Sequence, residues 1–109
     1  MKDPALFSAQ AEILKAMAQP VRLAIVDYLT DGERCVCEIV EEIRAGRSNV
    51  SRHLALMQRA GVLASRRDGL KIYYRLQCPC VADFLRCTKG VMRDRVRRGQ
   101  RLLALCSSR

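Results

Sequence analysis

Apolar residues recur at helical spacing along most of the chain, which predicts a mainly α-helical protein. Repeats at i, i+3 and i+4 place these side chains on one face of a helix, while turn residues separate one segment from the next. The pattern predicts five helices, at about 3–17, 20–30, 37–45, 48–60 and 79–106. A short strand is expected at 33–36.

The segment 47–76 combines one of these helices with a predicted β-hairpin. Strands at about 64–67 and 71–76 are joined by Asp68-Gly69, a dipeptide that suits a two-residue turn because both residues tolerate positive φ. The glycine-containing break Ala45-Gly46-Arg47 is typical of a helix-turn-helix turn, and Ser48 is expected to cap the next helix. The fold class is therefore predicted to be a winged helix-turn-helix, mainly α with a small β-hairpin wing.

One domain, residues 1–109, is expected from the length and from the absence of linkers or repeats. The last helix carries a longer apolar face than so small a core can cover, so we interpret it as a dimer interface.

The charge balance indicates what kind of partner the protein binds. The formal net charge is +9 and half of the residues are hydrophobic, which excludes disorder throughout and favours a polyanion, first nucleic acid and then an acidic membrane surface. No apolar run approaches the roughly 20 residues that span a bilayer, and the N-terminal decapeptide lacks the order of a signal peptide. We therefore expect a cytoplasmic protein with no membrane partner.

Double-stranded DNA is the expected partner, because helix order, wing and charge agree. A merely solvated cationic surface is the alternative. Base-reading side chains are expected at the exposed start of the recognition helix: Ser48, Asn49, Ser51 and Arg52. Cations placed for phosphate or minor-groove contact are Arg47, Arg59, Arg66, Arg67 and Lys71. His53, the only histidine, is expected to be packed and hydrogen-bonded rather than a ligand or a base.

Six cysteines in a reducing compartment indicate metal or redox chemistry rather than structural disulfides. Cys35-Val36-Cys37 precedes a predicted helix, where a thiolate is stabilised, and thiolates select soft ions. The two sulfurs converge only if Cys35 lies in extended backbone before the helix. Two thiolates leave the site incomplete, and the third ligand is left open. Its candidate sources are Cys78, Cys80, Cys87 and a partner subunit's Cys106, and Cys78 is expected to come close if the short strand near Cys35 pairs with 71–76.

Four stretches together match a family pattern: AQPVRLAIVDYL, ERCVCEIVEEI, SNVSRHLALMQRAGVL and SRRDGLKIYYRL. Over nearly its whole length the chain resembles the ArsR/SmtB family of metal-sensing winged-helix repressors, closest to the arsenic-sensing branch. The resemblance implies a homodimer built from the first and last helices. It also implies operator binding without the effector and release when the effector binds.

The resemblance also bears on the effector. Arsenic sensors of this type have a third cysteine three residues after Cys-Val-Cys, where this chain has Val40. The zinc-sensing branch uses histidines of the last helix, and this chain has none there. Arsenite, or antimonite, is therefore the expected effector at Cys35 and Cys37, with Cd(II), Pb(II) or Hg(II) as the alternative.

The cysteines also allow other interpretations. Two Cys-x5-Arg matches, beginning at Cys80 and Cys87, are typical of phosphatases and some arsenate reductases, but both fall inside one predicted helix, so no enzyme is expected. The cysteines could instead form a redox or persulfide switch. A structural zinc site is disfavoured by the lack of a Cys-x2-Cys knuckle, and for Cys87 and Cys106 plain packing is an even alternative.

Overall fold

The computed structural model describes residues 3–107, and its elements confirm a mainly helical chain with a three-stranded wing. The four short helices, one of them followed by the 3-10 turn η1 (Leu29–Asp31), are α1 (Pro4–Met17), α2 (Pro20–Tyr28), α3 (Val36–Ile43) and α4 (Arg47–Arg59). The strands and the long last helix are β1 (Arg34–Cys35), β2 (Leu63–Asp68), β3 (Lys71–Leu76) and α5 (Cys80–Ser107). Residues 1, 2, 108 and 109 of the predicted domain lie outside the described residues.

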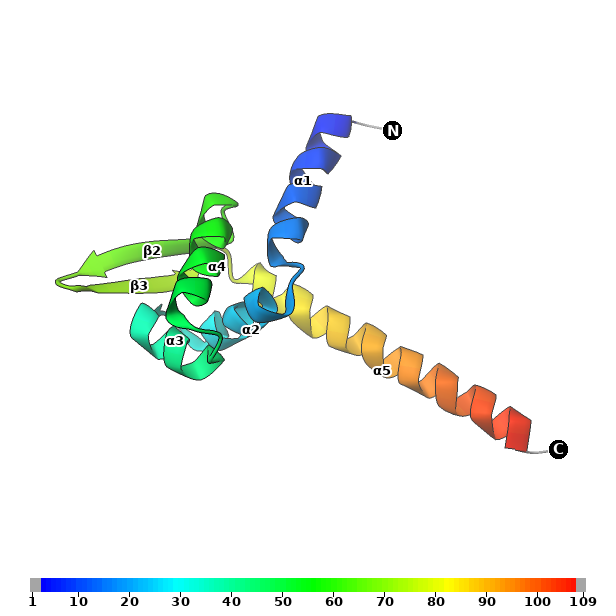
Figure 1. The fold of residues 1–109 in the computed structure, drawn as a ribbon. Helices are drawn as coiled ribbons and strands as arrows, with labels where there is room; N and C mark the ends of the chain where they lie inside the picture. The colour runs from blue at the N-terminus through cyan, green and yellow to red at the C-terminus, as the bar shows by residue number, and fades with distance from the viewer. Residues whose placement is uncertain (1–2, 108–109) are drawn as a thin grey trace.

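The hydrophobic core lies where α2, α3 and α4 meet under the base of the wing (Figure 1). Each helix contributes apolar residues to the core, and the most deeply buried ones are Ile25, Val26, Ile39, Val50, Leu54 and Met57. Val62 and Leu63 close the core from the start of β2. We use the term winged-helix body for α2, α3, α4 and the sheet.

Three predicted helix ends differ from the structure by a few residues. The second helix was expected to reach Thr30, but its α-helical part ends at Tyr28 and the chain continues as a 3-10 turn that stops at Gly32. The third helix begins at Val36 instead of Cys37, because Cys35 is its N-cap in extended backbone. It ends at Ile43, since Arg44 adopts a left-handed conformation with φ 56°.

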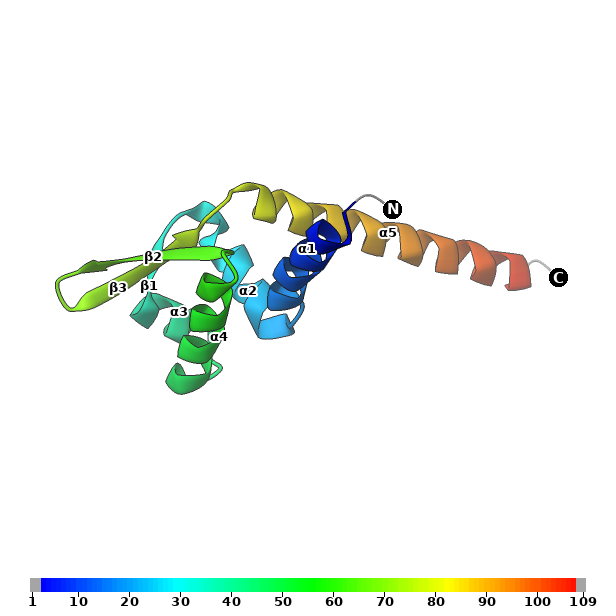
Figure 2. The same ribbon diagram turned by 90° about the horizontal axis from the view of Figure 1, so that it is seen from above.

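The wing is an antiparallel sheet with strand order β1-β3-β2 (Figure 2). The expectation that Asp68-Gly69 forms the turn is wrong, because Asp68 pairs with Lys71 and the loop is Gly69-Leu70. Gly69 has φ +61° and is the only residue of that loop with positive φ, which is the pattern of a turn with glycine at its first central position. Strand β2 is therefore one residue longer at the tip than predicted, while β3 begins at Lys71 as predicted.

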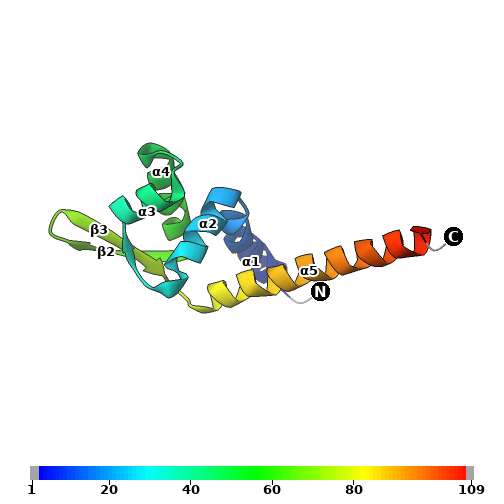
Figure 3. The ribbon, with the colours of Figure 1, turned by 90° about the horizontal axis from the view of Figure 1, so that it is seen from below.

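Helix α5 runs away from the winged-helix body and makes the molecule elongated (Figures 1 and 3). The radius of gyration is 18.0 Å, against about 13 Å for a compact domain of this length. After Thr88, almost every described residue of α5 is exposed, including Met92 and Val96 at 60 %. Within residues 3–107, no helix is both long and apolar enough to span a membrane.

Candidate nucleic-acid interface and thiol sites

Helix α4 has one buried and one exposed face, as a recognition helix requires. Val50, Leu54 and Met57 are buried in the core, while Arg47, Ser48, Ser51 and Arg52 are exposed. The expectation that Ser48 caps this helix is wrong. Gly46 is the N-cap, with φ +86°, and its carbonyl oxygen accepts a hydrogen bond from Val50 N at 2.9 Å. Glycine takes that backbone conformation without strain, so the helix begins one residue earlier and Ser48 becomes its second residue.

Two of the predicted base-reading side chains contact each other. The Arg52 guanidinium donates a hydrogen bond from Nη2 to Asn49 Oδ1 at 2.9 Å, one helical turn apart on the exposed surface. Arginine can donate to the two acceptors of guanine, and asparagine can donate to N7 of adenine and accept from its N6 amino group, so this pair presents both kinds of base-reading side chain from one spot on α4. The structure thus gathers Asn49 and Arg52, with Ser48 and Ser51 beside them on the same helix.

The predicted wing cations are divided between the two faces of the hairpin. Arg66 lies opposite Tyr73, while Arg67 lies opposite Ile72, so adjacent arginines point to opposite sides of the sheet. The Arg66 guanidinium binds the Glu33 carboxylate with Nε and Nη2, and it stacks over the Tyr73 ring at 4.6 Å. Arg66 is therefore held by the wing itself, and Glu33 is a residue that the sequence reasoning missed.

Electrostatics at this contact favours the charged pair. The hydrogen bonds from Arg66 hold the pKa of the Glu33 carboxyl below its usual value. Both side chains are largely open to water, so the pair orients Arg66 more than it stabilises the fold. Glu33 lies in the short strand expected at 33–36, but the register that brings it to Arg66 is seen only in the structure.

His53 is packed and hydrogen-bonded, as predicted. Its Nδ1 accepts a hydrogen bond from Arg22 Nε at 3.0 Å, which ties α4 to α2. Burial, with help from the nearby charges of Arg22 and Arg52, lowers the pKa of the imidazole. His53 is therefore a neutral structural acceptor behind the recognition surface.

The Cys35–Cys37 pair has the local geometry that convergence requires. Cys35 is 3 % exposed and sits in extended backbone (φ −76°, ψ 156°) as the N-cap of α3, and its backbone N–H donates to Glu38 Oε1 at 3.1 Å. Cys37 lies within the first turn of α3 and is exposed. The two sulfurs are joined in a disulfide bond of 2.05 Å. A soft ion would bind the reduced form of this pair, because the thiolate is the ligand.

A groove of about 320 Å³ connects this cysteine pair with the proposed DNA-contacting elements. Arg47 and Ser51 of α4 line the groove together with Leu70 and Lys71 of the wing. From the sequence, Arg47 and Lys71 were predicted to contact phosphates and Ser51 to contact bases. That they line one groove with Cys35 and Cys37 was not predicted. The groove arises because β1 pairs with β3 and so brings the start of α3 beside the hairpin.

The register of β1 with β3 does not bring Cys78 beside Cys35 and Cys37. Pairing of β1 with β3 was expected to bring Cys78 close, but the register sets Cys35 opposite Tyr73. Cys78 lies five residues further along the chain, on the order of 15 Å away at about 3.3 Å per residue. Among residues 3–107, no group of three or more Cys, His, Asp or Glu side chains could hold a metal ion.

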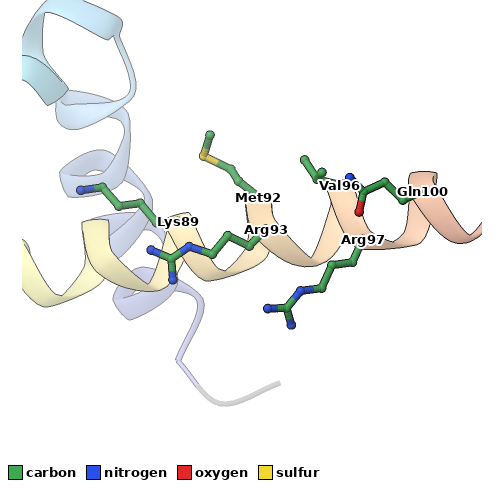
Figure 4. Close-up of a pocket in the computed structure, with 6 residues that line it drawn as sticks. All are labelled: Lys89, Met92, Arg93, Val96, Arg97 and Gln100. Atoms are coloured by element: carbon green, nitrogen blue, oxygen red, sulfur yellow. The ribbon is translucent and has the colours of Figure 1, made fainter.

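Helix α5 presents a mixed surface away from the body. Met92 and Val96 project to one side, while Arg93 and Arg97 extend toward another (Figure 4). Exposed apolar residues continue along α5 and are matched on α1 by Leu6, Phe7, Ile13 and Leu14. These are the two helices that the sequence analysis assigned to dimerisation.

Comparison with known proteins gives a consistent family. Residues 19–65 match the family model described as "Bacterial regulatory protein, arsR family". The HTH-type transcriptional regulator Rv0081 of Mycobacterium tuberculosis is 33 % identical over 93 residues, which cover 84 % of this chain and 82 % of that protein. Its crystal structure superposes with a TM-score of 0.77 over 89 % of this chain and 97 % of that chain.

Two further relatives are informative. The homodimeric winged helix-turn-helix domain of Mb0332 from Mycobacterium bovis, a possible ArsR-family regulator, is 30 % identical with a TM-score of 0.76, over 86 % of this chain and 87 % of that chain. The arsenical resistance operon repressor of Escherichia coli K12 is 37 % identical over 71 residues, which cover 64 % of this chain and 61 % of that repressor.

Proposed function

The chain belongs to the arsR family of bacterial regulatory proteins, and on that premise we propose that it is a homodimeric repressor that a soft ion releases from operator DNA. Trivalent arsenic is the proposed effector and antimony its close substitute, with Cd(II), Pb(II) or Hg(II) as the alternative. The members of this family are transcriptional regulators, so no enzymatic activity is proposed. Its compartment is proposed to be the cytoplasm, where thiols stay reduced.

DNA binding is assigned to α4 and the wing. Ser48, Asn49, Ser51 and Arg52 are proposed to read base edges, because they lie on the exposed start of α4 with the core residues behind them. Arg67 and Lys71 of the wing, with Arg47 and Arg59 at the two ends of α4, are proposed phosphate contacts. Arg66 joins them only after leaving Glu33.

The homodimer is proposed to form through α1 and α5. Both helices expose apolar side chains that a water-facing monomer leaves uncovered, such as Phe7 on α1 and Met92 on α5. The Mb0332 relative is homodimeric, which supports the same state here. A two-fold dimer would present two copies of α4 to successive turns of the major groove.

The effector site is proposed to contain the thiolates of Cys35 and Cys37. Soft thiolate ligands prefer thiophilic ions, and the strand-to-helix backbone turns both sulfurs to one side. Cys106 of the partner subunit is the third ligand that we propose, since Cys78 lies beyond the end of β3 while Cys35 is opposite Tyr73 near its middle. The similarity to an arsenical resistance operon repressor favours arsenic among the soft ions.

The shared groove is the observation that carries this proposal. Arg47 and Lys71, both proposed phosphate contacts, line the cavity beside Cys35 and Cys37. An ion bound there, with its third ligand drawn in, favours a conformer in which α4 and the wing are displaced. DNA is then released by differential affinity, and by linkage DNA weakens ion binding by the same factor.

Fluorescence anisotropy with operator DNA tests the proposal. The fully reduced wild type is expected to release DNA on addition of arsenite, while Cys35→Ser binds DNA normally and no longer responds. Cys78→Ser is the matched control, with the same side-chain change at a pair that lies outside the groove, and it should respond like wild type. Unchanged affinity with arsenite in both wild type and Cys35→Ser would rule out the sensing mechanism.

A redox switch is the second candidate, because Cys35 and Cys37 are joined by a disulfide in the structure. In that case a peroxide, which takes two electrons and two protons from the thiols, would release DNA without any metalloid. Mass spectrometry after mild oxidation, set beside an arsenite titration under strict reduction, separates the two. A redox switch requires that DNA release accompany disulfide formation, which lowers the mass of the Cys35–Cys37 peptide by about 2 Da, the mass of two hydrogens.

A further inference from the structure

A second cysteine pair, Cys78-Pro79-Cys80, joins strand β3 to helix α5. The Cys78 and Cys80 sulfur atoms lie 2.7 Å apart, and both side chains are exposed. The main chain fixes this arrangement. Val81 N donates to Cys78 O at 3.2 Å and Ala82 N donates to Pro79 O at 3.1 Å, so the chain turns directly into the helix.

Packing holds the turn in place. Ala82 is buried, and Val81 and Leu85 pack against the core cluster, so the first turn of α5 is anchored on one side. Pro79 restricts its own backbone angle φ between the two cysteines. Cys78 and Cys80 therefore converge on the solvent side of a rigid joint, with the thiols already positioned for one ligand.

This pair is spatially distinct from Cys35 and Cys37. The β1–β3 register leaves on the order of 15 Å between Cys78 and the residue opposite Cys35, as estimated from the rise per residue. None of the groove-lining residues belongs to 77–80. One chain thus carries two separate dithiols.

We propose that Cys78 and Cys80 form a second ligand site, specific for a trivalent arsenical that carries one organic group. Two sulfurs fill two of the three arsenic valences, and an organic substituent fills the third. No third Cys, His, Asp or Glu completes a metal cluster among residues 3–107, so the missing valence is best supplied by the ligand. The open surroundings of the pair leave room for such a substituent.

The chemistry balances without any change of oxidation state. An arsenical R–As(OH)₂ condenses with the two thiols, two As–S bonds replace two As–OH bonds, and two water molecules leave. Cys78 and Cys80 supply the two sulfurs, which lie close together and are both exposed, so the two As–S bonds close one ring. A linear two-coordinate Hg(II) is disfavoured, because it needs sulfurs on opposite sides of the ion, whereas the joint holds both on one side.

The test uses the full chain with Cys35→Ser and Cys37→Ser, reduced with a phosphine and titrated with phenylarsine oxide. Intact mass spectrometry is expected to show one phenylarsenic group per chain. Iodoacetamide should then label only two thiols, those of Cys87 and Cys106. Adding Cys78→Ser to this background should weaken binding by about 100-fold or more, since the second thiol no longer acts at a millimolar effective concentration.

Cys87→Ser in the same background is the matched control and should leave the adduct intact. Cys80→Ala must reproduce the loss seen with Cys78→Ser, and circular dichroism should match the parent because both side chains are exposed. An adduct mapped to Cys87 or Cys106, or one that survives Cys78→Ser, overturns the proposal.

This inference stands independently of arsenite sensing at the other pair. In wild type, two phenylarsenic groups per chain are expected, one at each dithiol. A protein that loses the Cys35–Cys37 adduct but keeps the second one contradicts the proposed function alone, and the reverse result contradicts only the second site.

Discussion

The two cysteine pairs occupy the same kind of junction, but the surroundings of their first cysteines differ. In each pair the first cysteine precedes a helix and the second lies in its first turn, so an i, i+2 spacing that would diverge within a helix brings two sulfurs together. Cys35 is nevertheless 3 % exposed within the winged-helix body, whereas Cys78 and Cys80 are open to solvent at the base of α5. The local geometry is alike and the environment is not.

The difference separates what spacing determines from what tertiary position determines. Spacing sets whether two thiols can share a ligand. Position determines which elements a bound ligand can displace. The first pair borders α4 and the wing tip through the groove, whereas the second lies outside that groove, between the end of β3 and the start of α5. A regulator can therefore carry two similar chelating sites of which one is coupled to DNA binding.

The largest expected effect is on stability and comes from a core residue that packs beneath Cys35 and Cys37. Ile39 of α3 is fully buried and packs into the core below Cys35 and Cys37. Ile39→Ala leaves a cavity and is expected to lower the free energy of unfolding by about 2–5 kcal/mol. Urea denaturation of the reduced protein measures it.

Phe84→Ala on α5 is the contrasting variant, since Phe84 is 47 % exposed. If α5 is covered only in the dimer, Phe84→Ala should lower the free energy of unfolding only slightly in dilute protein, and the loss should grow with protein concentration. A cost equal to that of Ile39→Ala at every concentration would show that the two regions do not differ in the way described.

The next effect concerns DNA affinity. Arg52→Ala removes a proposed guanine contact and the hydrogen bond to Asn49, so we expect operator affinity to fall by about 1–3 kcal/mol with relaxed sequence preference. Arg101→Ala on α5 removes the same charge far from α4 and should stay within about 0.5 kcal/mol. Anisotropy with an operator selected from random DNA compares them. An equal loss for both would indicate that net charge alone drives binding.

Much of this comparison was predictable from the sequence. Periodicity gave the helices, because apolar residues such as Val50, Leu54 and Met57 must share one face to be buried. The strand-to-helix position of Cys35 followed from the requirement that both sulfurs converge. The winged helix-turn-helix class followed from helix order, the glycine break and the hairpin.

What failed depended on registers and caps that a single sequence does not fix. The turn was predicted at Asp68-Gly69 but lies at Gly69-Leu70, because Asp68 pairs with Lys71 and only the glycine has positive φ. Gly46, and not Ser48, is the N-cap of α4, because glycine adopts the positive φ found there without strain. The contact of Arg66 with Glu33 joins residues 33 positions apart, which local pattern cannot reveal.

A smaller effect tests how freely the wing of the winged-helix body reaches DNA. Glu33→Gln removes the carboxylate that holds Arg66, so the guanidinium becomes available for a phosphate. We expect operator binding to strengthen by up to about tenfold in low salt and the salt dependence to steepen by about one unit. Anisotropy over a salt series measures both quantities.

Asp68→Asn is the matched control for Glu33→Gln. It makes the same change in charge, but its carboxylate lies 3.9 Å from Arg66 without the hydrogen bonds that Glu33 accepts. We expect a weaker gain than for Glu33→Gln. Equal gains would mean that net charge, and not release of Arg66, explains the result.

The smallest effect is a pH dependence confined to the winged-helix body, because its source is the half-buried His53 of α4 and no histidine lies in α5. Burial lowers the pKa of His53 in the folded state below its ordinary value of 6.5. The unfolded chain therefore takes up a proton first as pH falls, so stability is highest above about pH 6.5 and declines as pH drops through the folded pKa. Protonation also removes the acceptor of the Arg22 hydrogen bond and places two cations side by side.

His53→Gln keeps an acceptor but does not titrate, so urea denaturation between pH 7.5 and about 5 should show a decline in wild type and a flatter profile in the variant. The window stops above the range where Glu33, whose pKa is also lowered, begins to protonate. Identical profiles for both proteins would mean that His53 carries no proton linkage and that its contact with Arg22 serves packing alone.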